Sequence, residues 1–105
     1  MKGYQLSGVS RGVIAIENLD FDGHQTVGLS IASALSSALV VGAVYRVWAS
    51  VACFIKTGTS AVSATTSDFP LGPQVDKYIT IDAGNEYVAG IVSSGTGVLY
   101  ITRLK

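Results

Sequence analysis

The sequence has little charge, and the charges that it has cancel. Only 13% of the 105 residues are Asp, Glu, Lys or Arg, and seven basic residues balance seven acidic ones. Proteins that bind nucleic acid carry a basic excess or a basic stripe, so we expect no nucleic-acid partner. A surface with few charges is more easily dehydrated against another protein, and the composition therefore favours assembly.

Cysteine and histidine occur once each, as Cys53 and His24. A single cysteine excludes a disulfide within the chain and is compatible with a reducing cytoplasm. His24 follows Asp20 and Asp22, but zinc takes three or four nitrogen or sulfur ligands and calcium six or more oxygens. We interpret this segment as a solvated turn and predict no metal and no cofactor.

Motifs that carry catalysis are missing as well. The sequence has no Gly-x-Ser-x-Gly turn, and its carboxylates are scattered with no aromatic platform beside them. The segment 95–97, Gly-Thr-Gly, lacks the lysine and the helix of a phosphate-binding loop. Cys53 lies between apolar residues, which predicts a buried, inert thiol. We therefore predict that the protein is not an enzyme.

One long run lacks charge altogether. No Asp, Glu, Lys or Arg occurs between Gly23 and Tyr45, and a run of this kind resembles a membrane helix in hydropathy. Interspersed serines, and the β-branched residues that gather at its end, favour strands instead. Two strands are the preferred interpretation, and a membrane helix is the alternative. No apolar stretch follows Lys2, so we expect no signal peptide.

Alternating Val, Ile, Thr and aromatic residues predict strands along most of the chain. The clearest is residues 43–50, whose two faces carry Val44, Arg46 and Trp48 on one side and Tyr45, Val47 and Ala49 on the other. Further strands are expected at residues 12–16, 25–31, 51–56, 77–82, 86–93 and 98–104, the last three as a meander or two hairpins. Loops are expected at 17–23, 32–38 and 57–68, and two prolines exclude a central strand in 69–73.

These elements predict an all-β fold: a small antiparallel β-sandwich or jelly-roll-like barrel of about seven or eight short strands. We expect a single domain over residues 1–105, with residues 1–10 as an N-terminal arm that docks on a neighbour. The candidate interface residues are mostly aromatic: Tyr45, Arg46, Trp48, Phe69 and Tyr100. For Trp48 we favour a position capping the core, with a binding anchor as the alternative.

Residues 35–104, about two thirds of the chain, resemble small β proteins that are encoded among the structural genes of tailed bacteriophages. The resemblance rests on a succession of short motifs: Gly42 with Tyr45-Arg46-Val47, then 53–58, the Ser/Thr/Ala segment 60–66, the proline turn 69–73, Tyr78-Ile79, and 97–102. In the proline turn the order of the prolines is shifted, and the first 34 residues lie outside the resemblance.

The resemblance implies a protein of the virion, made in the cytoplasm of the host bacterium, and brings no catalytic residues with it. A capsid decoration or cement protein is the function expected first. It would bind other capsid proteins and itself, with a trimer favoured, and would need no membrane. A component of the head–tail junction or tail is one alternative. A small carbohydrate-binding sandwich is another, for which Trp48 is the candidate for the exposed aromatic shelf.

Overall fold

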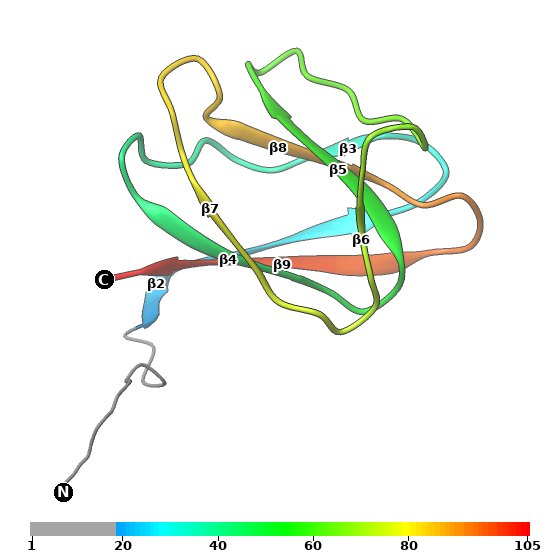
Figure 1. Cartoon of the computed structure of the whole chain (residues 1–105), viewed down its shortest axis with the longest axis horizontal. Coiled ribbons are helices and arrows are strands. Elements are labelled where there is room, and N and C mark those ends of the chain that lie inside the picture. The colour runs from blue at the N-terminus through cyan, green and yellow to red at the C-terminus, as the bar shows by residue number, and fades with distance from the viewer. Residues whose placement is uncertain (1–18) are drawn as a thin grey trace, which may run out of the picture.

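The computed structural model describes residues 19–105, and these form two four-stranded antiparallel sheets packed face to face (Figure 1). The first sheet has the strand order β2-β9-β4-β7, with β2 at Leu19–Leu29, β4 at Val44–Ala49, β7 at Lys77–Thr80 and β9 at Gly97–Leu104. The second has the order β3-β8-β5-β6, with β3 at Ala34–Leu35, β5 at Cys53–Gly58, β6 at Phe69–Leu71 and β8 at Tyr87–Ile91.

The chain passes from one sheet to the other at every connection except the one from β5 to β6. Together with the strand orders, this path is that of a jelly roll. The two sheets stay open at both sides and form a sandwich, not a closed barrel. The predicted all-β sandwich is confirmed. The strand expected at residues 12–16 and the arm at 1–10 lie outside the described residues.

The meander expected for the last three strands is wrong, and so is the alternative of two hairpins. β7 pairs with β4, β8 pairs with β3 and β5, and β9 lies between β2 and β4, so none of the three pairs with another. The connecting residues 81–86 and 92–96 cross between the sheets, which lie about 10 Å apart, twice the spacing of paired strands. Gly84 and Gly95 take positive φ angles of 86° and 74° in these crossings.

The loop expected at residues 17–23 is also wrong in part, because β2 already begins at Leu19. Leu19 and Asp20 pair with the end of β9, and the register then shifts between Asp20 and His24. The three residues inside this bulge include Gly23, where an added Cβ would lie 2.8 Å from the Cβ of Arg103. The bulge leaves His24 opposite Thr102 on β9.

The charge-free run between Gly23 and Tyr45 contains most of β2, all of β3 and the start of β4. Strands are thus the correct interpretation of this run, but it contains parts of three strands and not of two, because β3 lies inside the loop expected at residues 32–38. The interpretation of the run as a membrane helix is wrong. Across residues 19–105, the structure has no helix with the length and apolar character needed to cross a bilayer.

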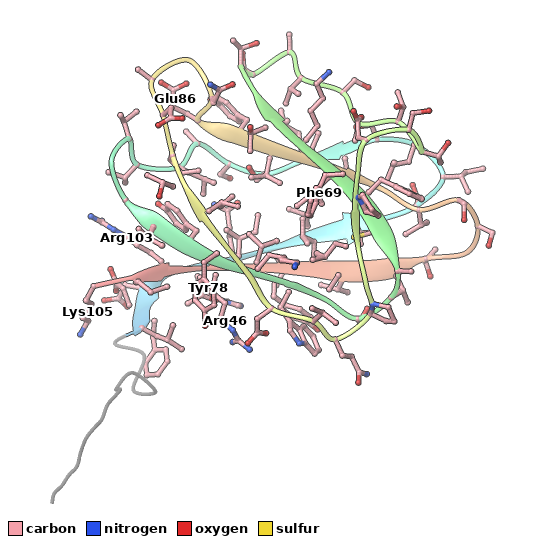
Figure 2. The ribbon with its side chains drawn as sticks, in the orientation of Figure 1. Arg46, Phe69, Tyr78, Glu86, Arg103 and Lys105 are labelled. Atoms are coloured by element: carbon pink, nitrogen blue, oxygen red, sulfur yellow. The ribbon has the colours of Figure 1, made fainter. Side chains whose placement is uncertain are left out.

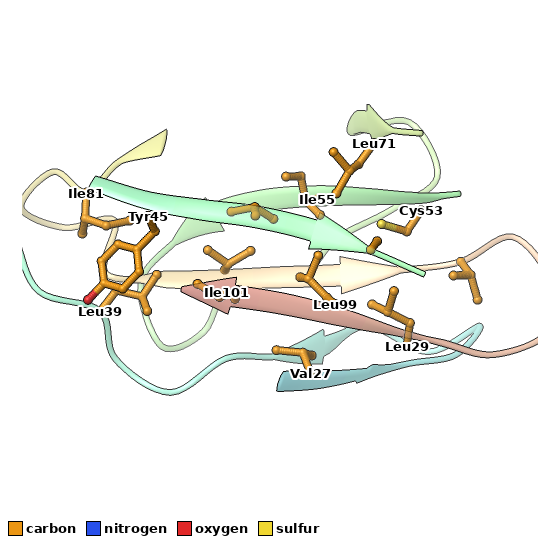
Figure 3. Packing of buried hydrophobic residues seen from close by; sticks show 14 residues of the cluster. Val27, Leu29, Leu39, Tyr45, Cys53, Ile55, Leu71, Ile81, Leu99 and Ile101 are labelled. Atoms are coloured by element: carbon orange, nitrogen blue, oxygen red, sulfur yellow. The ribbon is translucent and has the colours of Figure 1, made fainter. Parts of the chain in front are cut away.

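The core lies between the sheets and takes alternate residues of each strand (Figure 3). On β4 the buried face is Tyr45, Val47 and Ala49, as the alternation predicts. On β5, Cys53 and Ile55 point inward, and on β9 the central Leu99 and Ile101 are fully buried. β6, which contains Pro70, lies at a sheet edge, in agreement with the exclusion of a central strand there.

Replacing Leu99 by Ala tests this core. The side chain is fully buried at the centre of the sandwich, so its truncation leaves a cavity and we expect a loss of about 2–5 kcal/mol in the free energy of unfolding. Urea denaturation followed by circular dichroism measures it. Thr96→Ala, in the exposed turn before β9, is the control and should change stability by less than about 0.5 kcal/mol. Equal stability of the two variants would contradict the assigned core.

Candidate functional site

The outer face of the first sheet carries a cluster of polar and aromatic side chains that the register brings together. His24 on β2 pairs with Thr102 on β9, and Thr102 pairs with Arg46 on β4. In the next row of the sheet, Tyr100 of β9 pairs with Trp48 of β4. We call these five residues the aromatic face. They line a shallow hollow of about 260 Å³.

Rings pack against one another across this face. The ring centroids of Trp48 and Tyr100 lie 5.2 Å apart with the planes at 51°, a tilted pair. The His24 ring stacks over Tyr100 at 6.1 Å and 21°, and His24 Nδ1 shares a hydrogen bond of 2.7 Å with Thr102 Oγ1. Aromatic pairs in such geometries stabilise each other by about 0.5–1.5 kcal/mol beyond their burial, so the rings hold fixed positions while staying partly exposed.

An ion pair borders the aromatic face. Arg46 Nη2 donates a 2.9 Å hydrogen bond to Asp76 Oδ1, with the two side chains 30% and 39% exposed. Asp76 belongs to the connection between β6 and β7. A 2.8 Å hydrogen bond from Gln74 N to Ala49 O joins this connection to the end of β4. Gln74 adopts a positive φ of 58°, a conformation that L-residues rarely take, to make this turn.

The guanidinium of Arg46 is not fully satisfied. Within the described residues its Nε is a buried donor that has no acceptor. A buried unpaired donor costs about 1–3 kcal/mol, which exceeds the ~0.2–1 kcal/mol that an exposed ion pair such as Arg46–Asp76 contributes.

A second hollow, of about 430 Å³, lies where the open sides of the two sheets face each other. We call it the edge groove. It is lined by residues of β5, β6 and β7 and of the segment before β6, namely Ile55, Lys56, Thr57, Asp68, Phe69, Lys77, Tyr78 and Ile79. Figure 2 shows Phe69 on β6, and Tyr78 of β7 next to Arg46, its register partner on β4. Phe69 is 53% and Tyr78 45% exposed.

The five predicted interface residues separate into three places. Arg46, Trp48 and Tyr100 meet on the aromatic face, and Phe69 lines the edge groove. Tyr45 lies in the core, where its hydroxyl accepts a 3.0 Å hydrogen bond from Val40 N; a side chain buried inside the sandwich has no surface to offer a partner.

The position favoured for Trp48, capping the core, is wrong, because β4 turns this ring to the outer face. Sequence reasoning did not identify His24, Thr102 or Asp76 as parts of this site. His24 was assigned to a turn, and the sequence carries no signal for the bulge that places it opposite Thr102. Asp76 forms its ion pair with Arg46, which lies 30 residues earlier in the sequence. No local pattern predicts a contact over this separation.

We also searched residues 19–105 for a metal site and for a reactive thiol. No group of three His, Cys, Asp or Glu side chains there is placed to hold a metal ion. Asp20 accepts a hydrogen bond from the backbone of Asp22, while His24 turns toward Thr102. Cys53 is buried, and burial raises the pKa of its thiol above the usual value.

Comparison of the chain with protein-family models, with curated proteins and with solved structures finds no match to any of them.

The thiol of Cys53 should resist modification in the folded protein. Its raised pKa lowers the fraction of reactive thiolate, and burial blocks access. We expect a disulfide reagent at mildly alkaline pH to label Cys53 only after unfolding in concentrated guanidinium. A Cys53→Ala, Thr96→Cys double variant moves the thiol to an exposed turn and should label at once. Rapid labelling of folded wild-type protein would show that β5 opens more readily than its burial implies.

Proposed function

We propose that this chain is a structural protein of a tailed-bacteriophage virion, most simply a decoration or cement protein that binds the capsid shell as a homo-oligomer. The observation that carries the proposal is the edge groove, where aromatic side chains remain exposed between the open sides of both sheets. The sequence resemblance and the low charge support it. The jelly-roll architecture alone does not, since shell proteins and lectins both use it.

The edge groove has the composition of a protein-binding surface. Exposed Phe69 and Tyr78 supply apolar area, and aromatic residues are enriched at protein interfaces. Lys56, Lys77 and Asp68 provide charges of both signs along the groove. Charges of both signs suit a contact with another copy of a chain whose own net charge is zero.

The opposite side of the sandwich also exposes apolar residues. There β2 and β3 are the edge strands. Phe21 of β2 is 82% exposed, Ile31 in the following loop 70%, and Leu35 of β3 40%. These residues are spread along the side, from near the start of β2 to the loop beyond its end, and we infer that they supply apolar area to a contact.

Two different apolar sides on opposite edges favour a head-to-tail contact. If the β2/β3 side of one copy enters the edge groove of the next, the interface is heterologous, and such interfaces close into rings when the rotation permits. A trimer is the smallest such ring, in agreement with the trimer expected from the sequence. A ring also multiplies weak contacts to a shell through effective concentration.

The same properties suit a ring at the head–tail junction, which stays the alternative location. Both locations need a protein contact outside the ring. Antibody labelling of purified virions by electron microscopy distinguishes them, since decoration proteins cover the whole shell and a junction protein occupies one vertex.

Variants of the two sides test the head-to-tail contact. We expect wild-type protein to scatter light as a discrete oligomer and both Phe69→Lys and Ile31→Lys to be monomers, because each places a charge in an apolar contact. A mixture of the two variants retains one intact interface per pair and should form dimers. Val41→Lys, at an exposed turn residue outside both sides, is the matched control and should keep the wild-type mass.

A monomeric wild type, or variants that keep its mass, would refute the ring. If the mixture of Phe69→Lys and Ile31→Lys forms no dimer, the contact instead joins the same side of two copies.

Binding to the shell is tested separately. Purified wild-type protein should cosediment with capsid shells of the phage that encodes it, and shells lacking it should rupture at lower temperature. The Phe69→Lys monomer should bind at least about tenfold more weakly through loss of multivalency. Absence of the chain from purified virions by mass spectrometry would overturn the proposed function.

A further inference from the structure

We propose that the aromatic face is a second, separate binding site, which takes one neutral pyranose ring of a glycan. This goes beyond the proposed function, because none of the five residues of the face lines the edge groove. The inference rests on three observations: the partly exposed ring pair, the polar groups around it, and the absence of net charge.

The rings supply the surface that a sugar requires. A pyranose presents an apolar face of C–H bonds, which packs on the π-face of an aromatic side chain. The ring centroids of Trp48 and Tyr100 lie 5.2 Å apart with the planes at 51°, so the two rings contact each other and form an inclined surface that lines the hollow. Its volume of about 260 Å³ is below the ~300–1,000 Å³ of sites for drug-sized ligands, which limits the ligand in contact to a single ring.

The polar groups around the rings match sugar hydroxyls. Each hydroxyl both donates and accepts a hydrogen bond, and the face offers both functions side by side. Arg46 donates, and the Asp76 carboxylate, 39% exposed, accepts. Neighbouring charged groups of opposite sign form stronger hydrogen bonds than neutral ones. Among the described residues, the Nε of Arg46 is the one buried side-chain N or O atom without a hydrogen-bond partner, while its Nη2 is bonded to Asp76.

The charge around the aromatic face distinguishes a neutral saccharide from the other ligands that aromatic sites bind. A single-stranded nucleic acid stacks on aromatic rings but also needs a positively charged groove for its backbone. Here the guanidinium of Arg46 is paired with Asp76, and the chain has no net charge. The same pairing argues against an acidic sugar, so the proposed ligand is neutral.

Binding at this site can be followed by tryptophan fluorescence, because Trp48 is the only tryptophan of the chain. The full-length protein is titrated with cellotriose, maltotriose, chitotriose and a mannose trisaccharide while Trp48 fluorescence is recorded. We expect a saturable change with at least one of the four. Tyr100→Ala and Asp76→Ala should each weaken that binding about tenfold or more, the first through lost stacking and the second through a lost acceptor. Tyr100→Phe keeps the ring and should bind within about twofold of wild type.

A matched control variant distinguishes saccharide binding at the aromatic face from self-association at the edge groove. Phe69→Lys, in the edge groove, should lose self-association and keep wild-type saccharide affinity, whereas Tyr100→Ala should lose affinity and keep the oligomer. Thermal denaturation of each variant establishes that it folds.

Three outcomes would overturn the proposal. The first is that no saccharide of the panel changes the fluorescence. The second is binding that Tyr100→Ala and Asp76→Ala leave undiminished. The third is that both variants instead lower the oligomer mass or the binding to shells, which would make the aromatic face a protein interface.

Discussion

Because each sheet buries one face against the other, every strand of the sandwich must direct alternate side chains inward, and the remaining ones necessarily point outward. On β4 this places Tyr45, Val47 and Ala49 in the core and leaves Arg46 and Trp48 on the outer face. The same alternation on β9 buries Leu99 and Ile101 and leaves Tyr100, between them, half-buried on the outer face. The burial of the core thus determines where the aromatic face lies, since a one-residue slip of either strand would exchange the two sets.

The parts of the fold that depend on local pattern follow from the sequence, and the parts that depend on distant pairing do not. Alternation over residues 43–50 predicts β4 and its two faces, and the two prolines in 69–73 exclude a central strand there, where the structure has the edge strand β6. The meander of the last three strands fails because turn composition does not reveal whether a chain returns to the same sheet or crosses to the other. The aromatic face depends on a bulge in β2 and is bordered by an ion pair between residues 30 apart in sequence, so the sequence identifies only three of its five residues, Arg46, Trp48 and Tyr100.

Two surfaces of different character follow from this architecture. The edge groove and the β2/β3 side arise where the sheets end, so they expose apolar side chains that strands at an edge cannot cover. The aromatic face lies on a sheet, where cross-strand pairs hold rings at fixed separations. In the proposed assembly, copies would join through their sides, and the aromatic face of each copy would remain free.

Pro70 has a consequence for how such copies are able to join. β6 is three residues long, and its proline carries no backbone N–H, so the outer rim of this strand offers few donors to an incoming strand. Copies that meet here must recognise one another by side-chain shape and charge rather than by continuing the hydrogen-bond ladder. A ladder has no built-in end and grows into fibrils, whereas in the proposed ring the side-chain contacts would be satisfied once the ring closes. Pro70 would therefore favour such a closed assembly over fibrils in a chain with zero net charge and little electrostatic repulsion between copies.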